Sequence, residues 1–211
     1  MLDKYKSELM IRKSRHINYF NTLDKSIQND VLKRIDELVA EEQEYCDKGN
    51  YGHLCNMLSL VAIYEVLQKH CKSEEEAYNI VAEEMFKFVQ PSKEKFQKLS
   101  KKSWFWTVIK KIVPIGFKKG SGIGWKYTWH NDTPKNEFRF ETNECIYQKI
   151  LSKRGLIKLG PLFCQCDVIN YGELDGIDFQ RTKTLCYGDD ECNFIFIKHN
   201  KGEKFTRTEA R

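Results

Sequence analysis

Residues 123–142, "IGWKYTWHNDTPKNEFRFET", are the stretch in which the chain changes from helical to strand patterning. From Ile123 to Trp129 every second residue is large and apolar, and the residues between them are small or polar. This alternation is typical of a half-buried strand. The turn signal "NDTPKN" follows, and "EFRFET" returns with Phe138 and Phe140 on one face. The stretch therefore predicts an antiparallel hairpin.

A second hairpin is predicted near the end of the chain. Its strands are "IDFQRTKTLCY" and "CNFIFIKH", and the acidic segment "GDDE" between them is interpreted as a solvated turn. Cys192, Phe194 and Phe196 share one face of the second strand. Between the hairpins, "NECIYQKILSKRG" predicts a short helix that is capped near Asn143 and ends at Gly155.

The first half of the chain has helical patterning. "DKSIQNDVLKRIDELVAEEQEYC" predicts an amphipathic helix with Asp24 as its cap, and "HLCNMLSLVAIYEVLQKHC" is apolar enough to be buried on more than one side. Ser73 is expected to cap a third helix, which Pro91 ends. A fourth helix is expected from Ser92 towards Pro114.

These elements predict the α+β class, with an N-terminal helical layer packed on an antiparallel sheet built from two C-terminal hairpins with intervening helices. A chain of 211 residues fits a single domain, residues 1–211. Its expected parts are a mainly helical part (1–118), a hairpin, helix and hairpin part (119–200) and a tail (201–211).

Composition limits the partners and the location. A net charge of +5 is mild for this length, so we expect no nucleic-acid partner. The charged N-terminal residues contain no apolar signal core, and no apolar run approaches the roughly 18 residues that span a bilayer. We therefore expect a cytoplasmic protein without integral membrane contact, in which the eight cysteines are reduced thiols.

The lysines around "WFW" (residues 104–106) have two interpretations. They can lie on an anionic membrane surface, or they can form a solvated face while one of the aromatic side chains docks inside. The second interpretation is favoured, because on a helix these lysines spread around the circumference. The lysines concerned are Lys93, Lys95, Lys98, Lys101, Lys102, Lys110 and Lys111.

The segment "LGPLFCQCDVIN" (residues 159–170) contains the strongest candidate for a reactive thiol. Its proline suits a first helical turn, so we expect a helix in which Cys164 and Asp167 are neighbours and Cys166 points elsewhere. Cys164 in the first turn would have its pKa lowered by the helix dipole. The alternative is that Cys164 is a small buried apolar residue.

Asp167 and Arg181 are the charged candidates. Asp167 can orient a water molecule or bind a cationic nitrogen, but its charge opposes thiolate formation nearby, so a compensating cation such as Arg181 is expected. The planar guanidinium of Arg181 suits a substrate carboxylate. On a regular strand Thr182 and Thr184 would face together, opposite Arg181, as strand formers or as hydroxyl donors.

The ordered features "FRFETNECIYQKILSKRG", "LGPLFCQCD", "RTKTL" and "GDDECNFIF" resemble the L-2-amino-thiazoline-4-carboxylic acid hydrolase family. The resemblance implies hydrolytic opening of a small thiazoline ring to an N-carbamoyl cysteine. It also implies two catalytic residues, Cys164 and Asp167, and a set of substrate-binding residues: Arg181, Thr182, Thr184, Cys145 and Cys192. Cys186 stands where the family often has a small or apolar residue, and Cys166 is less clearly matched.

Two other interpretations stay open beside a cofactor-independent hydrolase of a small-molecule substrate. Four cysteines could bind zinc, but no Cys-x-x-Cys pair occurs, so we expect no metal and no cofactor. Cys145 and Cys192 would then be packing residues. Since no histidine stands near any candidate cysteine in the sequence, a non-catalytic small-molecule-binding or sensory domain is the main alternative. The oligomeric state is left open.

Overall fold

The computed structural model of the protein describes residues 2–71, 73–200, 202–208 and 210–211. Two compact units are formed, one from Met1–Phe88 with Gly120–Ile123, the other from Val89–Lys119 with Gly124–Arg211. The single-domain organisation expected from the sequence stays a prediction, and residues 201 and 209 of the expected tail lie outside the described residues.

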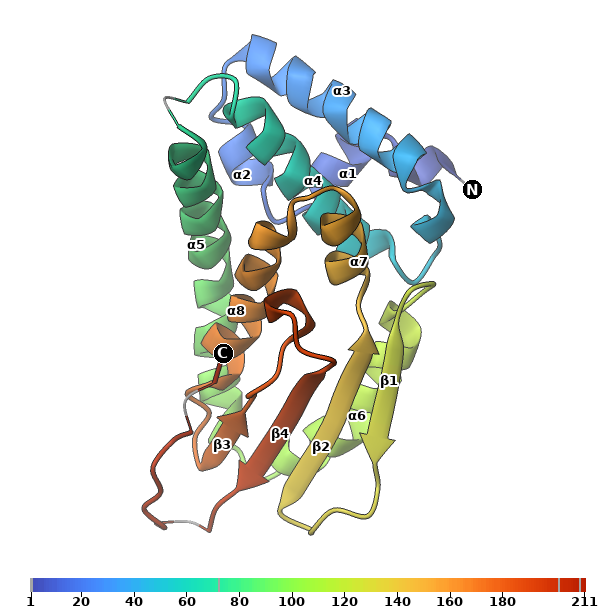
Figure 1. Ribbon diagram of the computed structural model, residues 1–211. Helices are drawn as coiled ribbons and strands as arrows, with labels where there is room; N and C mark the ends of the chain where they lie inside the picture. The colour runs from blue at the N-terminus through green and yellow to red at the C-terminus, as the bar shows by residue number, and fades with distance from the viewer. Residues whose placement is uncertain (1, 72, 201, 209) are drawn as a thin grey trace. The chain divides into compact units, whose positions relative to one another are not determined.

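The first unit is helical (Figure 1). Its core helix α4 has twelve buried residues, because apolar side chains occupy every side of it. Val31, Ile35 and Leu38 of α3 are fully buried, and α1 and α3 both contact α4. Burial of α4 on more than one side is therefore confirmed. The elements are η1 Leu2–Tyr5, α1 Ser7–Lys13, α2 Ile17–Phe20, α3 Lys25–Glu41, η2 Gln43–Tyr45, α4 Tyr51–Leu67 and the first part of α5 Glu74–Ser100.

The prediction that Pro91 ends a helix is wrong. Helix α5 continues from Glu74 to Ser100 with Pro91 inside it, and no new helix opens at Ser92. Proline removes one N–H and turns away the carbonyl four residues earlier. Here Pro91 and Lys87 are both exposed, so that carbonyl stays accessible to water.

The next helix also differs from the prediction. Helix α6, Phe105–Gly120, contains Pro114 and continues beyond it. The real break between the two helices is the turn at residues 101–104. Ser100 marks this break: its hydroxyl donates to the carbonyl of Gln97 at 2.9 Å and accepts the N–H of Asp175 at 2.8 Å.

The second unit contains the sheet, and its two hairpins confirm the α+β class. The strand order is β1-β2-β4-β3, with every neighbouring pair antiparallel. Strands β2 and β4 join the hairpins, with Phe138 opposite Phe196 and Phe140 opposite Phe194. The strands are β1 Lys126–His130, β2 Glu137–Glu144, β3 Ile177–Gln180 and β4 Cys192–Lys198; between and after them lie α7 Ile146–Lys153, η3 Ile157–Leu159, α8 Gly160–Tyr171 and η4 Leu185–Tyr187.

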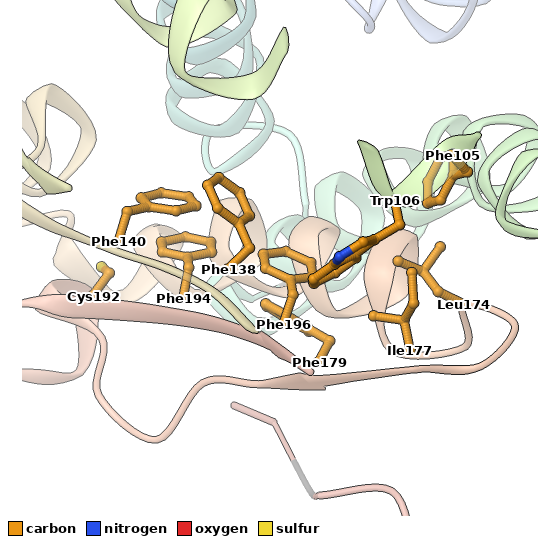
Figure 2. Packing of buried hydrophobic residues seen from close by; sticks show 10 residues of the cluster. All are labelled: Phe105, Trp106, Phe138, Phe140, Leu174, Ile177, Phe179, Cys192, Phe194 and Phe196. Atoms are coloured by element: carbon orange, nitrogen blue, oxygen red, sulfur yellow. The ribbon is translucent and has the colours of Figure 1, made fainter. Parts of the chain in front are cut away.

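An aromatic core covers one face of this sheet (Figure 2). Phe105 and Trp106 of α6 join it, which confirms that aromatic residues of "WFW" dock inside. Phe140 and Phe194 stack in parallel across the β2–β4 pair, with ring centroids 4.7 Å apart. Such pairs add about 1 kcal/mol each beyond their burial, so the core holds the hairpins in register.

Two local predictions about the strands and caps need correction. Strand β3 ends at Gln180, so the following residues are not on a regular strand. Helix α7 has Cys145, not Asn143, at its N-cap position, because β2 continues to Glu144. Its expected end at Gly155 is supported by the positive φ of 67° at that residue, a conformation that favours glycine.

Candidate active site

Helix α8 and the loop after β3 bring the candidate residues together within the second unit. Gly160 is the first residue of α8 and Pro161 lies in its first turn, as predicted. Cys164 therefore lies in the second turn, and its predicted place in the first turn is wrong. The helix dipole weakens beyond the first turn, so another influence must act on the Cys164 thiol.

Arg181 is the central cation of this group. Its side chain is only 1% exposed, and its three guanidinium nitrogens all donate hydrogen bonds. Nη1 donates to Oδ2 of Asp167 at 3.0 Å, Nη2 to the main-chain carbonyl of Cys164 at 2.6 Å, and Nε to the carbonyl of Arg211 at 2.6 Å. Arg181 thus joins α8 to the chain's last residues and provides the compensating charge expected for Asp167.

Side chains bind the main chain of the loop that carries Arg181. In a regular strand, these N–H groups would instead donate to the main chain of the neighbouring strand. Oδ1 of Asn193 accepts the N–H groups of Thr182 and Lys183 at 2.9 and 2.8 Å. Oδ2 of Asp189 accepts the N–H of Thr184 at 2.7 Å. Asp189 of the acidic turn therefore supports this loop in addition to meeting solvent.

This loop geometry separates the two threonines. Thr184 is fully buried, whereas Thr182 is exposed, so they do not share a face as a regular strand would require. The hydroxyl of Thr182 accepts a hydrogen bond from Nδ2 of Asn193 at 2.9 Å. The hydroxyl of Thr184 donates to the carbonyl of Arg211 at 3.3 Å.

The Cys164 sulfur has a second cysteine beside it. The Cys186 thiol donates a hydrogen bond to Cys164, and this bond lowers the pKa of Cys164 most strongly. Burial opposes the shift, the Arg181 charge adds to it, and the Asp167 charge works against it. The pKa of Cys186 is raised, first by the same hydrogen bond and then by burial. The directions of the two shifts favour Cys164 over Cys186 as the thiolate.

Gly160 leaves the space in which Cys186 approaches α8. A Cβ atom at Gly160 would lie 2.7 Å from Sγ and 2.8 Å from Cβ of Cys186, too close for any real contact. Gly160 and Cys164 are four residues apart on α8, so they occupy one face of the helix. The absence of a side chain at Gly160 thus lets Cys186 reach Cys164.

The other cysteines around α8 are buried. Burial raises the pKa of Cys192 to about 12 and also raises that of Cys145. Cys192 lies in the aromatic core (Figure 2), and its Sγ accepts the N–H of Leu185 at 3.2 Å. The Sγ of Cys166 is 3.4 Å from the carbonyl of Leu162 in its own helix. These contacts favour packing over chemistry for all three thiols.

Three contributors were not identified from the sequence: Cys186, Asn193 and Gly160. Cys186 was set aside because it departs from the family pattern, and that departure was the available signal. No spacing rule connects Asn193 with a loop eleven residues earlier. Among the described residues no group of three or more His, Cys, Asp or Glu side chains is placed to hold a metal ion.

Comparison with known proteins gives one match. A family model described as L-2-amino-thiazoline-4-carboxylic acid hydrolase matches residues 53–196, more than half of the chain. The match covers Cys164, Asp167, Arg181 and Cys186, and it confirms the resemblance noted in the sequence. Neither the curated proteins nor the solved structures give a match.

Proposed function

The chain belongs to the L-2-amino-thiazoline-4-carboxylic acid hydrolase family, and we propose that it hydrolyses a small thiazoline ring at the site around Cys164. The observation that supports this most directly is a thiol of lowered pKa on α8 together with Asp167 of the same helix, which pairs with Arg181 from the loop after β3. Perturbed thiol acidity next to a paired carboxylate is typical of a reactive site.

Cys164 is proposed as the nucleophile. Its thiolate attacks the ring carbon that lies between sulfur and nitrogen, the ring C–S bond breaks, and the ring sulfur takes a proton. The product remains bound to Cys164 as an isothiourea. Water then adds to the same carbon, and the Cys164 sulfur leaves as the thiolate, which gives an N-carbamoyl cysteine. One water is consumed, and the enzyme returns to its starting state.

Asp167 is proposed to direct the substrate and the water. Its side chain is 37% exposed, so a ligand can reach it, while Oδ2 is held by Arg181 at 3.0 Å. A carboxylate in this position can bind the cationic amidine nitrogen of the substrate and take a proton from the attacking water. Asp167 is therefore assigned both electrostatic recognition and general-base duty.

Arg181 is proposed as a positioning residue in this arrangement. It holds Asp167 and the carbonyl of Cys164, and its charge favours the thiolate. Direct capture of a substrate carboxylate by Arg181 is disfavoured in this arrangement, because its side chain is only 1% exposed and each guanidinium nitrogen already donates to the protein. Thr184 and Arg211 then support Arg181 and do not touch the substrate.

Turnover of 2-amino-thiazoline-4-carboxylate by the purified protein tests the proposal, with N-carbamoyl cysteine measured by chromatography. We expect Cys164→Ser to lower kcat/KM by roughly a hundredfold or more, and Asp167→Asn by roughly tenfold or more. Cys71→Ser is the matched control, because Cys71 is an accessible thiol in the other unit. Full activity in Cys164→Ser would reject the nucleophile.

A non-catalytic binding domain is the second candidate. One observation favours it: the groups that shift the pKa of Cys164 are Cys186, Arg181 and Asp167, and none of them is a histidine that could act as its base. In the same assay, saturable binding of the thiazoline by wild type without any product would favour this candidate over the hydrolase.

A further inference from the structure

One long stretch of the chain, most of it in the second unit, is strongly basic. Residues 95–131 contain nine lysines and no aspartate, glutamate or arginine. The segment therefore carries +9, and the rest of the chain carries −4, because the whole chain carries +5. The net charge of the whole chain hides this separation. The positive charge lies on the end of α5, on α6 and on β1.

Helix α6 shows two distinct faces. Its inner face packs on the aromatic core of the sheet through Phe105, Trp106, Ile109, Val113 and Phe117. Its outer face also carries large apolar side chains, and these meet solvent: Trp104 is 48% exposed, Ile112 58% and Ile115 54%.

The exposed side chains form one continuous stripe. Trp104 lies just before α6, and its carbonyl accepts the N–H of Val108, so it continues the helical spacing. At 100° per residue, Trp104, Val108, Ile112 and Ile115 fall within an arc of about 80°. We call these four residues the apolar stripe. Nothing in the packing of the described second unit covers it.

Lysines border the apolar stripe. Lys111 and Lys118 lie along one edge of it, Lys119 lies within its arc one turn beyond Ile115, and all three are exposed. Among the described residues none of the three is within ion-pair distance of a carboxylate, whereas Lys87, Lys93, Lys149 and Lys183 are paired. A long lysine side chain can lay its methylenes on an apolar surface and extend its charge to a phosphate layer.

We propose that this outer face of α6 docks on an anionic lipid bilayer surface. Negative lipid headgroups match the unpaired lysines, and the apolar boundary beneath them accepts Trp104, Ile112 and Ile115. A nucleic acid would match the charge but would leave the two isoleucines in water. The docking is peripheral, since no helix within the described residues is both long and apolar enough to cross a membrane.

Flotation with vesicles tests the proposal in the full chain. We expect binding to vesicles of equal parts phosphatidylserine and phosphatidylcholine, and none to phosphatidylcholine alone. Replacing Lys111, Lys118 and Lys119 by glutamine should lower the partition constant roughly fivefold per lysine. The matched control replaces Lys33, Lys48 and Lys69, which are exposed lysines of the first unit, and it should bind like wild type.

The apolar stripe is tested separately by Ile112→Ser with Ile115→Ser. Both side chains are more than half exposed, so the fold should survive, and we expect at least a tenfold loss of vesicle binding. Unchanged binding by this variant, or retention on a polyanion resin without vesicle binding, would overturn the membrane assignment. In wild type, brominated lipids should quench a tryptophan signal that Trp104→Phe removes. No such quenching would also overturn it.

Discussion

Two thiols, one in each unit, show what makes a cysteine acidic. Cys55 of α4 is fully buried in the first unit, and burial raises its pKa to about 11. Cys164 of α8 is only partly buried, and its pKa is lowered, because Cys186 donates a hydrogen bond to it and Arg181 lies nearby. Burial opposes this lowering of the Cys164 pKa. The partners of Cys164 therefore outweigh burial and make it the more acidic of the two thiols.

Replacement of Arg181, the cation beside Cys164, should give the largest effect, a loss of stability. Arg181→Met removes the guanidinium donors from the carbonyl of Cys164, from one oxygen of Asp167 and from the carbonyl of Arg211, which keeps only the longer hydrogen bond from Thr184. We expect the free energy of unfolding in urea to fall by about 4 kcal/mol, because removal of one partner of a buried ionic group costs about that much.

Lys183→Met is the matched control for this substitution. Lys183 lies on the same loop and pairs with Asp190, but its side chain is 44% exposed. The expected loss is much smaller, because solvent screens an exposed ion pair. Equal losses in the two variants would show that Arg181 is no more than a surface contact, and the contrast between the two thiols would lose the contribution of the Arg181 charge.

The first unit also contains a buried histidine, His16, whose effect can be measured as the pH dependence of stability. Burial, followed by the charge of Arg15, lowers the pKa of His16 to about 4. Nε2 of His16 is buried and finds no hydrogen-bond partner among the described residues. The unfolded chain binds a proton near pH 6.5 and the folded chain only near 4, so stability is complete above 6.5 and falls as the pH drops towards 4.

The size of this effect follows from the shift. We expect about 3 kcal/mol of unfolding free energy to be lost over that interval, measured by urea denaturation at several pH values. In His16→Gln most of this loss should be absent, and a smaller one should remain because burial also lowers the pKa of His53. A stability of wild type that rises on acidification would contradict the buried, neutral state of His16.

The fold was largely predictable because hydrophobic periodicity carries it. The alternation around Trp129 and the aromatic face of Phe194 and Phe196 define the two hairpins before any contact is known. The failures occurred where tertiary surroundings overrule a local signal. Pro91 is tolerated within α5 because the carbonyl that loses its donor, that of Lys87, lies on the exposed side of the helix. No local rule reveals this exposure.

The candidate site was predictable only in part. The family resemblance selected Cys164, Asp167 and Arg181, and the structure brings these three together. The role of Cys186 could not be predicted from the sequence. It depends on a close approach to α8, 26 residues earlier in the chain, which is possible only because Gly160 has no side chain. The sequence predicts a strand that continues through Thr182, but β3 ends at Gln180. The side chains of Asn193 and Asp189 accept the N–H groups of the following loop in place of a neighbouring strand, and no local pattern reveals this.

Direct measurement of thiol reactivity is the next sharpest test. At neutral pH we expect iodoacetamide to modify Cys164 roughly a hundredfold faster than Cys55 or Cys46, because burial raises the pKa of both of the latter to about 11. Cys71 is the accessible reference thiol, with its pKa raised by slight burial and by Glu76. Modified sites can be counted by peptide mass spectrometry. Faster labelling of Cys55 than of Cys164 would break the comparison.

The smallest expected effect isolates the hydrogen bond from Cys186. Cys186→Ala removes the donor, and Gly160→Ala should push it away, since the new Cβ would fall 2.7 Å from the Cys186 sulfur. Each variant should slow alkylation of Cys164 at neutral pH by roughly tenfold, the value of one hydrogen bond to a charged group. Each should also move the midpoint of the pH–rate curve upwards, because a lost donor destabilises the thiolate. Cys186→Ser keeps a donor and should restore most of the rate, whereas a purely structural role would leave the midpoint where wild type has it. If Cys186→Ala and Cys186→Ser titrate alike, Arg181 alone sets the acidity of Cys164, and the thiol pair has no part in it.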